Sequence, residues 1–148
     1  MSAIILLEGN DKRKAIRQVV TRSENLAKGV RDTARLLRAV SRRERIETTG
    51  IGHGVAIAHG KILGLDTVHV GLGVSREGID YQAVDGKPVR LLFVIASSPC
   101  LQVSYLQTLC HLLGIVRNPS YRTVLDDFRN VDFPVFCEKL EKDFAWLT

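Results

Sequence analysis

Residues 89–96 read V-R-L-L-F-V-I-A, and every position from Leu91 to Ala96 is apolar. A strand with one exposed face alternates apolar and polar side chains, whereas a strand covered on both faces is apolar throughout. The stretch therefore predicts the central strand of a sheet. Helices are expected on both faces of that sheet.

Other predicted strands lie upstream of this segment. Residues 67–74 are rich in β-branched side chains and predict a strand, residues 79–83 are also expected to form a strand, and Asp85-Gly86 supplies a turn between 79–83 and 89–96. A short apolar run at residues 3–7 predicts an edge strand. The chain thus has enough predicted strands to form a sheet that lies between two layers of helices.

Apolar residues at helical spacing occur before and after these strands. Asn118-Pro119 and the acidic residues Asp32 and Asp132 are suited to begin helices, and Gly29 is suited to end one. The predicted helices cover residues 11–28, 33 to the mid-forties, 101–113, 119 to about 128, and 132 to about 146. The order predicts an α/β fold in which helices flank both faces of a mixed central β-sheet, as a single domain over residues 1–148.

A glycine-rich stretch precedes the strands and holds two of the four histidines. Thr49 to Gly60 reads T-G-I-G-H-G-V-A-I-A-H-G. Closely spaced glycines allow turns whose N–H groups attract anions, and an imidazole beside them can titrate, accept a phosphoryl group or bind metal. Function is therefore expected to centre on His53 and His59.

Several motifs are excluded by spacing. The third glycine of a dinucleotide-binding fingerprint would fall on Val55 or Ile57, and there is no Walker loop and no G-x-S-x-G elbow. A metal site would need more ligands than the two histidines, and no Cys, Asp or Glu lies between them. No metal and no bound cofactor are expected.

Positive charge is concentrated near the start of the chain. The formal net charge is +5, and residues 1–48 hold twelve Lys or Arg against six Asp or Glu, whereas residues 49–148 hold nine against ten. Such a segment fits nucleic acid, a solvated helix face or a docking surface for an acidic protein. Because no aromatic residue lies between Lys12 and Arg45, a stacking platform is missing and no nucleic-acid partner is expected.

The compartment is expected to be the cytoplasm. No uninterrupted apolar run approaches the length of a membrane span, and the start of the chain lacks the basic-then-apolar order of a signal peptide. No membrane insertion is expected. The three cysteines lack C-x-x-C spacing, which predicts buried reduced thiols rather than disulfides or a zinc ribbon.

Histidine attack on phosphorus remains as the chemistry that fits this segment. It requires a neutral imidazole with one free nitrogen, together with a cation or N–H groups beside the charge that develops on the phosphoryl oxygens. Arg42, Arg43 and Arg45 lie just upstream of the glycines. The imidazole, the cations and the N–H groups that this reaction requires therefore lie close together in the sequence.

These residues resemble a known signature. R-E at 43–44, T-G-I-G at 49–52 and G-V-A-I-A-H-G at 54–60 are similar to the R-E…T-G-I-G-x-G-x-A-I-P-H-G pattern of fructose/mannitol-type enzyme IIA domains of the bacterial phosphotransferase system. D-G-K-P-V at 85–89, followed by L-L-F, is similar to a downstream stretch of that family. The resemblance extends from about residue 11 to residue 142 and implies the mannitol-type IIA sandwich fold.

The resemblance implies a role for each matching residue. His59 is the phosphoryl acceptor, charged by the phosphohistidine of an HPr-like carrier, and Arg43 steadies the phosphate. Tyr105 occupies the place of a second active-site histidine, where it can donate a hydrogen bond but cannot share a proton at neutral pH. His53 stands where the family often has Asn and is either a chance replacement or a helper. Ala58 replaces the family's proline, which predicts a looser approach to His59.

Two roles are consistent with this chemistry. The differences from the family signature at Ala58 and Tyr105 leave a third role open. The stretches 51–61 and 81–93 are similar to the nitrogen-related branch, and no IIB or membrane domain accompanies the sequence, so we expect a free-standing regulatory IIA protein with its own target proteins. A sugar-specific carrier that passes phosphate to a separate IIB is the alternative. A degenerate interaction module that is not phosphorylated is the third possibility.

Overall fold

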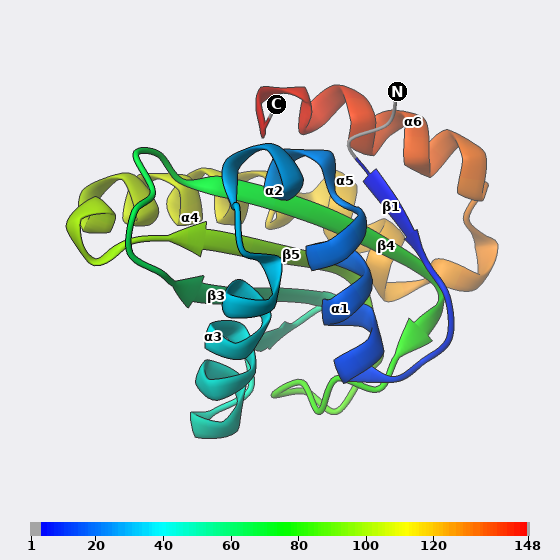
Figure 1. The fold of residues 1–148 in the computed structure, drawn as a ribbon. Coiled ribbons are helices and arrows are strands. Elements are labelled where there is room, and N and C mark those ends of the chain that lie inside the picture. Colours follow the sequence, from blue (N-terminus) through cyan, green and yellow to red (C-terminus); the bar gives the residue numbers. More distant parts are fainter. Residues whose placement is uncertain (1–3, 148) are drawn as a thin grey trace.

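The computed structural model describes residues 4–147, which contain a mixed five-stranded sheet with the order β1-β4-β5-β3-β2 (Figure 1). β1 is parallel to β4 and β3 is parallel to β5, whereas β4 and β5, and also β2 and β3, are antiparallel. The strands are β1 Ile4–Leu7, β2 Gly50–Gly52, β3 Val55–Lys61, β4 His69–Ile79 and β5 Val89–Ser97.

The predicted central strand is confirmed. β5 lies in the middle of the sheet, and every side chain from Leu91 to Ala96 is fully buried. Alternate residues enter two separate cores, because Leu92 and Val94 face one helical layer and Phe93 and Ile95 face the other. The uniform apolar run thus reflects two covered faces, as expected from its composition.

Within residues 4–147, three helices cover each face of the sheet. α1 Lys12–Arg22, α2 Glu24–Gly29 and α3 Thr33–Ile46 pack on one core, and α4 Gln102–Val116, α5 Pro119–Asp126 and α6 Phe133–Asp143 pack on the other (Figure 1). Short 3₁₀ turns occupy Pro99–Leu101, Phe128–Asn130 and Ala145–Leu147. The predicted α/β class is confirmed.

The first helical segment differs from its prediction. Residues 11–28 were expected to form one helix, but Ser23 is extended, with ψ near 125°, and separates α1 from α2. Its hydroxyl accepts a hydrogen bond from the amide of Leu26, while its own amide donates to the carbonyl of Val19. A buried serine thus ends one helix and begins the next, which apolar periodicity alone does not reveal.

Two features of the sheet were also predicted wrongly or missed. The expected strand at residues 79–83 is absent, because β4 continues to Ile79 and the chain then leaves the sheet, with Gln82 at a φ of 58°. The glycine-rich stretch forms the β2–β3 hairpin, in which Gly50 donates to Thr48 Oγ1 and Gly52, His53 and Gly54 have positive φ. The first residue of the predicted edge strand, residue 3, lies outside the described residues, whereas Ile4–Leu7 is confirmed at the edge.

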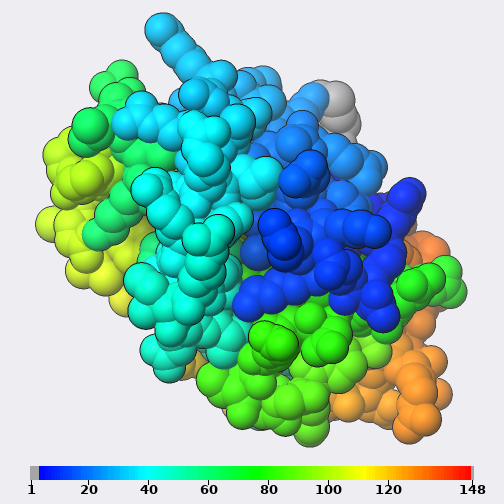
Figure 2. All heavy atoms as spheres, turned by 60° about the horizontal axis from the view of Figure 1, so that its bottom comes forward, coloured from blue at the N-terminus to red at the C-terminus, as the bar shows by residue number. Residues whose placement is uncertain are grey.

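The basic residues of the first third of the chain lie mainly on one helical layer. Figure 2 shows α1 and α3 side by side on this face of the molecule. Lys12 of α1 forms an ion pair with Glu44 of α3, with 2.8 Å between Nζ and Oε2. Most of the other basic side chains of the two helices are exposed: Arg13, Lys14, Arg17, Arg22, Arg35, Arg38, Arg42 and Arg45.

Two expectations from composition are modified by the structure. The three cysteines are free, but Cys100 and Cys110 are exposed rather than buried. Among the described residues, the helical stretch Pro99–Val116 has the length and apolar composition of a possible membrane span, a criterion that core helices of soluble proteins also meet. Polar residues interrupt this stretch, so it contains no long uninterrupted apolar run.

α3 packs closely on the part of β3 that carries His59. A Cβ placed on Gly60 would lie 3.0 Å from both Val40 Cγ2 and the backbone N of Val40, and 3.1 Å from Ala39 Cβ. Ala56 and Ala58, on the same face of the strand, are fully buried in that core. The small side chains of β3 therefore set how near α3 can lie to the sheet.

Gly60→Val is expected to destabilise the protein by about 2 kcal/mol, because the added side chain would overlap the backbone of α3 in a tightly packed core. Gly114→Ala is the matched control, since Gly114 is helical and a Cβ there has no neighbour within 4 Å. That change should stabilise α4 by about 0.5 kcal/mol. Urea unfolding followed by circular dichroism measures both, and a Gly60→Val protein as stable as wild type would contradict the packing argument.

Candidate functional site

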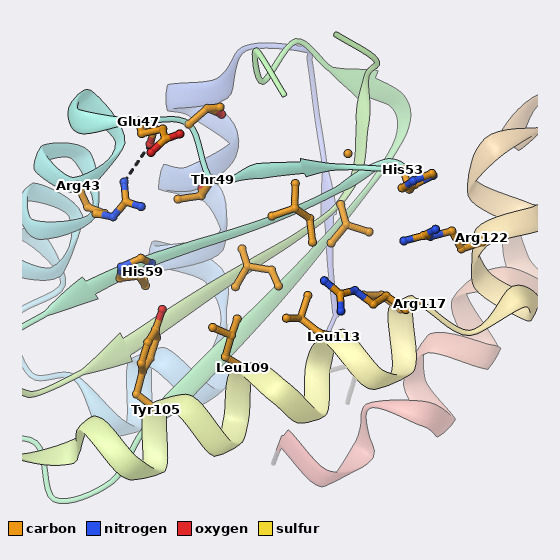
Figure 3. A pocket seen from close by; sticks show the side chains of 16 residues that line it. Arg43, Glu47, Thr49, His53, His59, Tyr105, Leu109, Leu113, Arg117 and Arg122 are labelled. Carbon is orange, nitrogen blue, oxygen red and sulfur yellow. Dashed lines mark hydrogen bonds between the residues drawn. The ribbon is translucent and has the colours of Figure 1, made fainter. Parts of the chain in front are cut away.

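A groove of about 420 Å³ lies between the β2–β3 edge of the sheet and the helices α4 and α5 (Figure 3). Three of the four predicted site residues, Arg43, His59 and Tyr105, gather at one end, and His53 lies at the other. The remaining lining residues are Glu47, Thr48, Thr49, Ile51, Gly52, Val55, Ile57, Leu109, Leu113, Val116, Arg117 and Arg122.

His59 lies where β3 loses one of its neighbouring strands. On one side it is in register with Ile95 of β5. On the other side β2 spans only Gly50–Gly52, and the amide of Ile57 donates to the carbonyl of Thr49, two residues before His59. The imidazole is half-buried and faces the groove, so a reacting group can approach it from outside.

The backbone that leads to His59 is not loosened by Ala58, which stands where the family has proline. Ala58 is fully buried and lies in register with Val94 in the parallel pairing of β3 with β5. Regular strand pairing therefore holds the backbone before His59 without a proline.

Arg43 reaches the groove from the last turn of α3. Its Nη1 donates to the backbone carbonyl of Glu47 at 3.0 Å, which satisfies a carbonyl just beyond the helix end. In Figure 3 the guanidinium lies next to the space beside His59. A hydrogen bond that uses one nitrogen leaves the remaining N–H donors of the fork available to an anion.

Tyr105 lies against His59 from the first turn of α4. The two ring centroids are 5.3 Å apart with a 48° tilt, and only 8% of Tyr105 is exposed. Burial raises the pKa of the Tyr105 phenol, and the charge of Arg43 partly offsets this rise. Its hydroxyl points toward the imidazole in Figure 3, so Tyr105 is a neutral hydrogen-bond donor at this end of the groove.

The pKa of His59 is lowered from its usual value. Burial is the main cause, and the positive charges of Arg43 and Lys61 add to it. The carboxylate of Glu44 and a hydrogen bond with the Ile57 backbone act in the opposite direction. His59 is therefore neutral at pH 7, which is the form that a nucleophilic imidazole requires.

Glu44 is the main functional-site residue that sequence analysis did not single out. Its carboxylate binds Lys12, accepts a hydrogen bond of 3.0 Å from the Tyr81 hydroxyl, and contacts both the hydroxyl and the amide of Thr49. Burial, with the Glu44 charge second, raises the pKa of Tyr81, so the phenol remains a donor. This network joins α1, α3 and the segment before β2, and the only sequence signal for it was the Glu that follows Arg43.

His53 is not brought next to His59. It occupies the tip of the β2–β3 turn with a φ of 55°, and its amide donates to Asp85 Oδ2 at 2.9 Å. Its Nδ1 lies 3.4 Å from Asp126 Oδ1, and its side chain is exposed. Figure 3 places it beside Arg122, at the opposite end of the groove from His59.

The other two histidines lie outside the groove lining. His111 stacks on Trp146 at 3.9 Å on the outer side of α4, and His69 is half-buried at the start of β4, where Nε2 is 3.3 Å from Thr67 Oγ1. Burial lowers the pKa of His69. Within residues 4–147, no three His, Cys, Asp or Glu side chains are grouped so as to hold a metal ion.

Comparison with known proteins identifies a family. Residues 2–133 match the model of "Phosphoenolpyruvate-dependent sugar phosphotransferase system, EIIA 2". Among curated relatives, the fructose-specific EIIABC component of the phosphotransferase system from Bacillus subtilis is 29% identical over 126 residues, covering 85% of this chain but only 20% of that protein. A nitrogen regulatory protein from Bradyrhizobium diazoefficiens is 28% identical over 112 residues, covering 76% of this chain and 72% of that protein.

A solved structure supports the same assignment. The nitrogen regulatory protein IIA-Ntr from Neisseria meningitidis superimposes with a TM-score of 0.72 at 27% identity, covering 82% of each chain. Sugar-specific and nitrogen-regulatory proteins are thus similar to this chain at comparable, low identity.

Single substitutions should move the pKa of His59 in opposite directions. Arg43→Gln removes a cation and should raise that pKa, whereas Glu44→Gln removes an anion and should lower it further. NMR titration of the imidazole resonances in the isolated protein measures both. If both variants shift the pKa of His59 in the same direction, loosened packing rather than the lost charge determines the change. That result would contradict the electrostatic account.

Proposed function

The chain belongs to the phosphoenolpyruvate-dependent sugar phosphotransferase system EIIA 2 family, and from this premise we propose that it carries a phosphoryl group on His59 in a regulatory role. Members of this family transfer phosphate through a histidine. The observation that carries the proposal is the placement of a neutral, half-buried His59 beside Arg43 and Tyr105 at one end of an open groove.

The proposed reaction is a transfer between two imidazoles. The hydrogen bond to the Ile57 backbone occupies one side of the His59 ring, and the free ring nitrogen attacks the phosphorus of a phosphohistidine on an HPr-like carrier. As the new P–N bond forms, the donor's P–N bond breaks, and its electron pair returns to the donor imidazole. The bond formed and the bond broken are both P–N bonds to an imidazole, so the free-energy change is small and the step is reversible.

Arg43 and Tyr105 stabilise the transferred group in this proposal. Charge spreads over the equatorial phosphoryl oxygens during transfer, and a guanidinium fork with free N–H donors can bind two of them. The Tyr105 hydroxyl adds a neutral donor from the opposite wall. Because Tyr105 cannot share a proton as a histidine can, onward transfer should be slower than in members with a second histidine.

Slow onward transfer favours regulation over transport. A phosphoryl group that persists on His59 adds nearly two negative charges at the mouth of the groove, which can switch the binding of target proteins. The proposed partners are an HPr-like donor and regulatory targets, and the proposed location is the cytoplasm. The alternative is a sugar-specific carrier with a separate IIB acceptor, which the similarity to a fructose-specific protein supports.

Incubation with phosphoenolpyruvate, an enzyme I and an HPr-like carrier should add one acid-labile phosphate to the wild-type protein. His59→Ala should accept none, whereas His53→Ala should be labelled normally. Arg43→Gln should slow labelling about a hundredfold, as expected for loss of a charge-stabilising donor, and Tyr105→Phe about tenfold. Intact-protein mass spectrometry over time measures each rate. An unlabelled wild type would favour a non-phosphorylated interaction module and overturn the proposal.

Transfer onward separates the regulatory and sugar-uptake roles. Phosphorylated protein mixed with a fructose-type IIB protein should retain most of its phosphate over many turnover times of the labelling reaction. Tyr105→His, which restores the family's second histidine, is the matched comparison and should pass phosphate on faster. Rapid transfer by the wild type would favour the sugar-carrier alternative.

A further inference from the structure

The carboxylate next to Arg43 in the sequence is bound on both of its oxygens. Glu44 follows Arg43 on α3, and only 7% of its side chain is exposed. Its Oε1 accepts hydrogen bonds from the hydroxyls of Tyr81 and Thr49. Its Oε2 binds Lys12 Nζ at 2.8 Å and the amide of Thr49 at 3.3 Å. An ionised carboxylate has about four lone-pair sites, so the protein itself occupies the acceptor capacity of Glu44.

Tyr81 holds the segment before β2 through its side chain and through its backbone. Its hydroxyl lies 3.0 Å from Thr49 Oγ1 as well as from Glu44 Oε1. Its backbone carbonyl accepts a hydrogen bond of 3.3 Å from Thr48 Oγ1. Tyr81 is fully buried, and Lys12 Nζ lies 4.4 Å from the centre of its ring. Two consecutive residues, Thr48 and Thr49, are thus tied to one buried tyrosine.

The guanidinium of Arg43 is bound by the residue just before this segment. Its Nη1 donates to the backbone carbonyl of Glu47 at 3.0 Å (Figure 3). That carbonyl and the amide of Thr48 belong to one planar peptide group, so restraining Thr48 also restrains the direction of the carbonyl. An arginine side chain has many rotamers, and holding it in one of them costs conformational entropy. The restrained carbonyl therefore keeps the guanidinium at the groove before a phosphoryl group arrives.

Most of this network lies outside the groove. Arg43 and Thr49 line the groove, whereas Lys12, Glu44 and Tyr81 do not. Contact between Tyr81 and a group on His59 is therefore not available, and any effect of Tyr81 on transfer has to pass through the residues that it holds.

Tyr81 also allows position to be separated from charge. Glu44 is an anion that raises the pKa of His59, so changing it would alter the imidazole directly. Burial, with the Glu44 charge second, raises the pKa of the Tyr81 phenol, which is neutral at pH 7. Removing the Tyr81 hydroxyl thus loosens the network without removing a charge.

We propose that Tyr81 is a positioning residue for phosphoryl transfer: it holds Glu44 and the segment before β2, and this segment holds the Arg43 guanidinium beside a phosphoryl group on His59. This inference rests on the proposed function, because Arg43 stabilises the transferred group only if His59 accepts it. The bonds that form and break are those of the proposed transfer, and Tyr81 touches none of the reacting atoms.

The test is Tyr81→Phe in the labelling reaction, with a phosphorylated HPr-like carrier as donor. The rate at saturating donor should fall about fivefold, because the arginine remains present but is held less precisely. That loss is smaller than the loss of about a hundredfold expected for Arg43→Gln. The KM for the donor should stay within roughly twofold of wild type, since Tyr81 lies outside the groove.

A double-variant comparison shows whether the hydroxyl acts through the arginine. Arg43→Gln/Tyr81→Phe should be no slower than Arg43→Gln alone, because the group that Tyr81 positions is already gone. If Tyr81 only supported the fold, its loss would slow labelling equally with and without Arg43.

A second measurement does not depend on phosphorylation. NMR relaxation of the Arg43 Nε–H group in the unphosphorylated protein gives its order parameter, which should be lower in Tyr81→Phe than in wild type. Lys12→Gln removes a different partner of the Glu44 carboxylate and should lower it as well. This variant takes the place of Tyr81→Phe if the latter does not fold.

Tyr121→Phe is the matched control. Tyr121 is also buried, and its hydroxyl donates to Asp143 Oδ2 at 2.6 Å. Lys139 Nζ lies 3.2 Å from the same oxygen and 4.6 Å from the centre of the Tyr121 ring. The same kinds of group thus meet on α5 and α6, in the core on the other face of the sheet. Tyr121→Phe should match wild type in labelling rate and in the Arg43 order parameter, and thermal unfolding should show that it and Tyr81→Phe are folded.

The outcomes separate this inference from the proposed function. If wild type is labelled and Tyr81→Phe is slowed no more than Tyr121→Phe, or is slowed equally without Arg43, the positioning role is overturned and transfer to His59 stands. If wild type accepts no phosphate, the proposed function fails, and the role of Tyr81 in transfer fails with it. A lower Arg43 order parameter in Tyr81→Phe would even then support the hold of the network on the arginine, whereas an unchanged one overturns the inference in either case.

Discussion

The site depends on the close contact between α3 and β3. The residues of β3 alternate between two faces, so Ala58 and Gly60 meet α3 while His59, between them, faces α4 and the groove. Because that contact has no room for larger side chains, α3 lies close enough for Arg43, at its end, to reach around the open edge of β3. Packing on one face of the strand thus fixes the chemistry on the other.

Neighbouring residues of α3 have opposite effects on His59. Arg43 lowers the pKa of the imidazole and also presents N–H donors to its surroundings, whereas Glu44 raises that pKa and is held inside a buried network. Tyr81 and Lys12 hold the Glu44 carboxylate in place. Burial and the positive charge of Arg43 outweigh the effect of the Glu44 carboxylate on the pKa of His59. His59 therefore stays neutral although the carboxylate that anchors the segment before β2 lies nearby.

The sequence predicts the parts of this structure that depend on local patterns. The unbroken apolar run of β5 identifies a strand covered on both faces, and Asp32 marks the start of α3 correctly. The strand expected at residues 79–83 fails because Tyr81 turns inward to Glu44, a contact with a residue 37 positions away. Arg117 could not be recognised as a groove residue for the same reason, since α4 and the sheet form that groove only when the chain is folded.

α4 lines the groove from one end to the other. Its first turn presents Tyr105 to His59, and the residue after its last turn is Arg117, so a single helix connects the two ends. The acceptor end is constrained by strand pairing, burial and the α3 contact, whereas Arg117 and His53 at the far end are exposed. Substitutions at the far end should therefore leave the geometry around His59 intact.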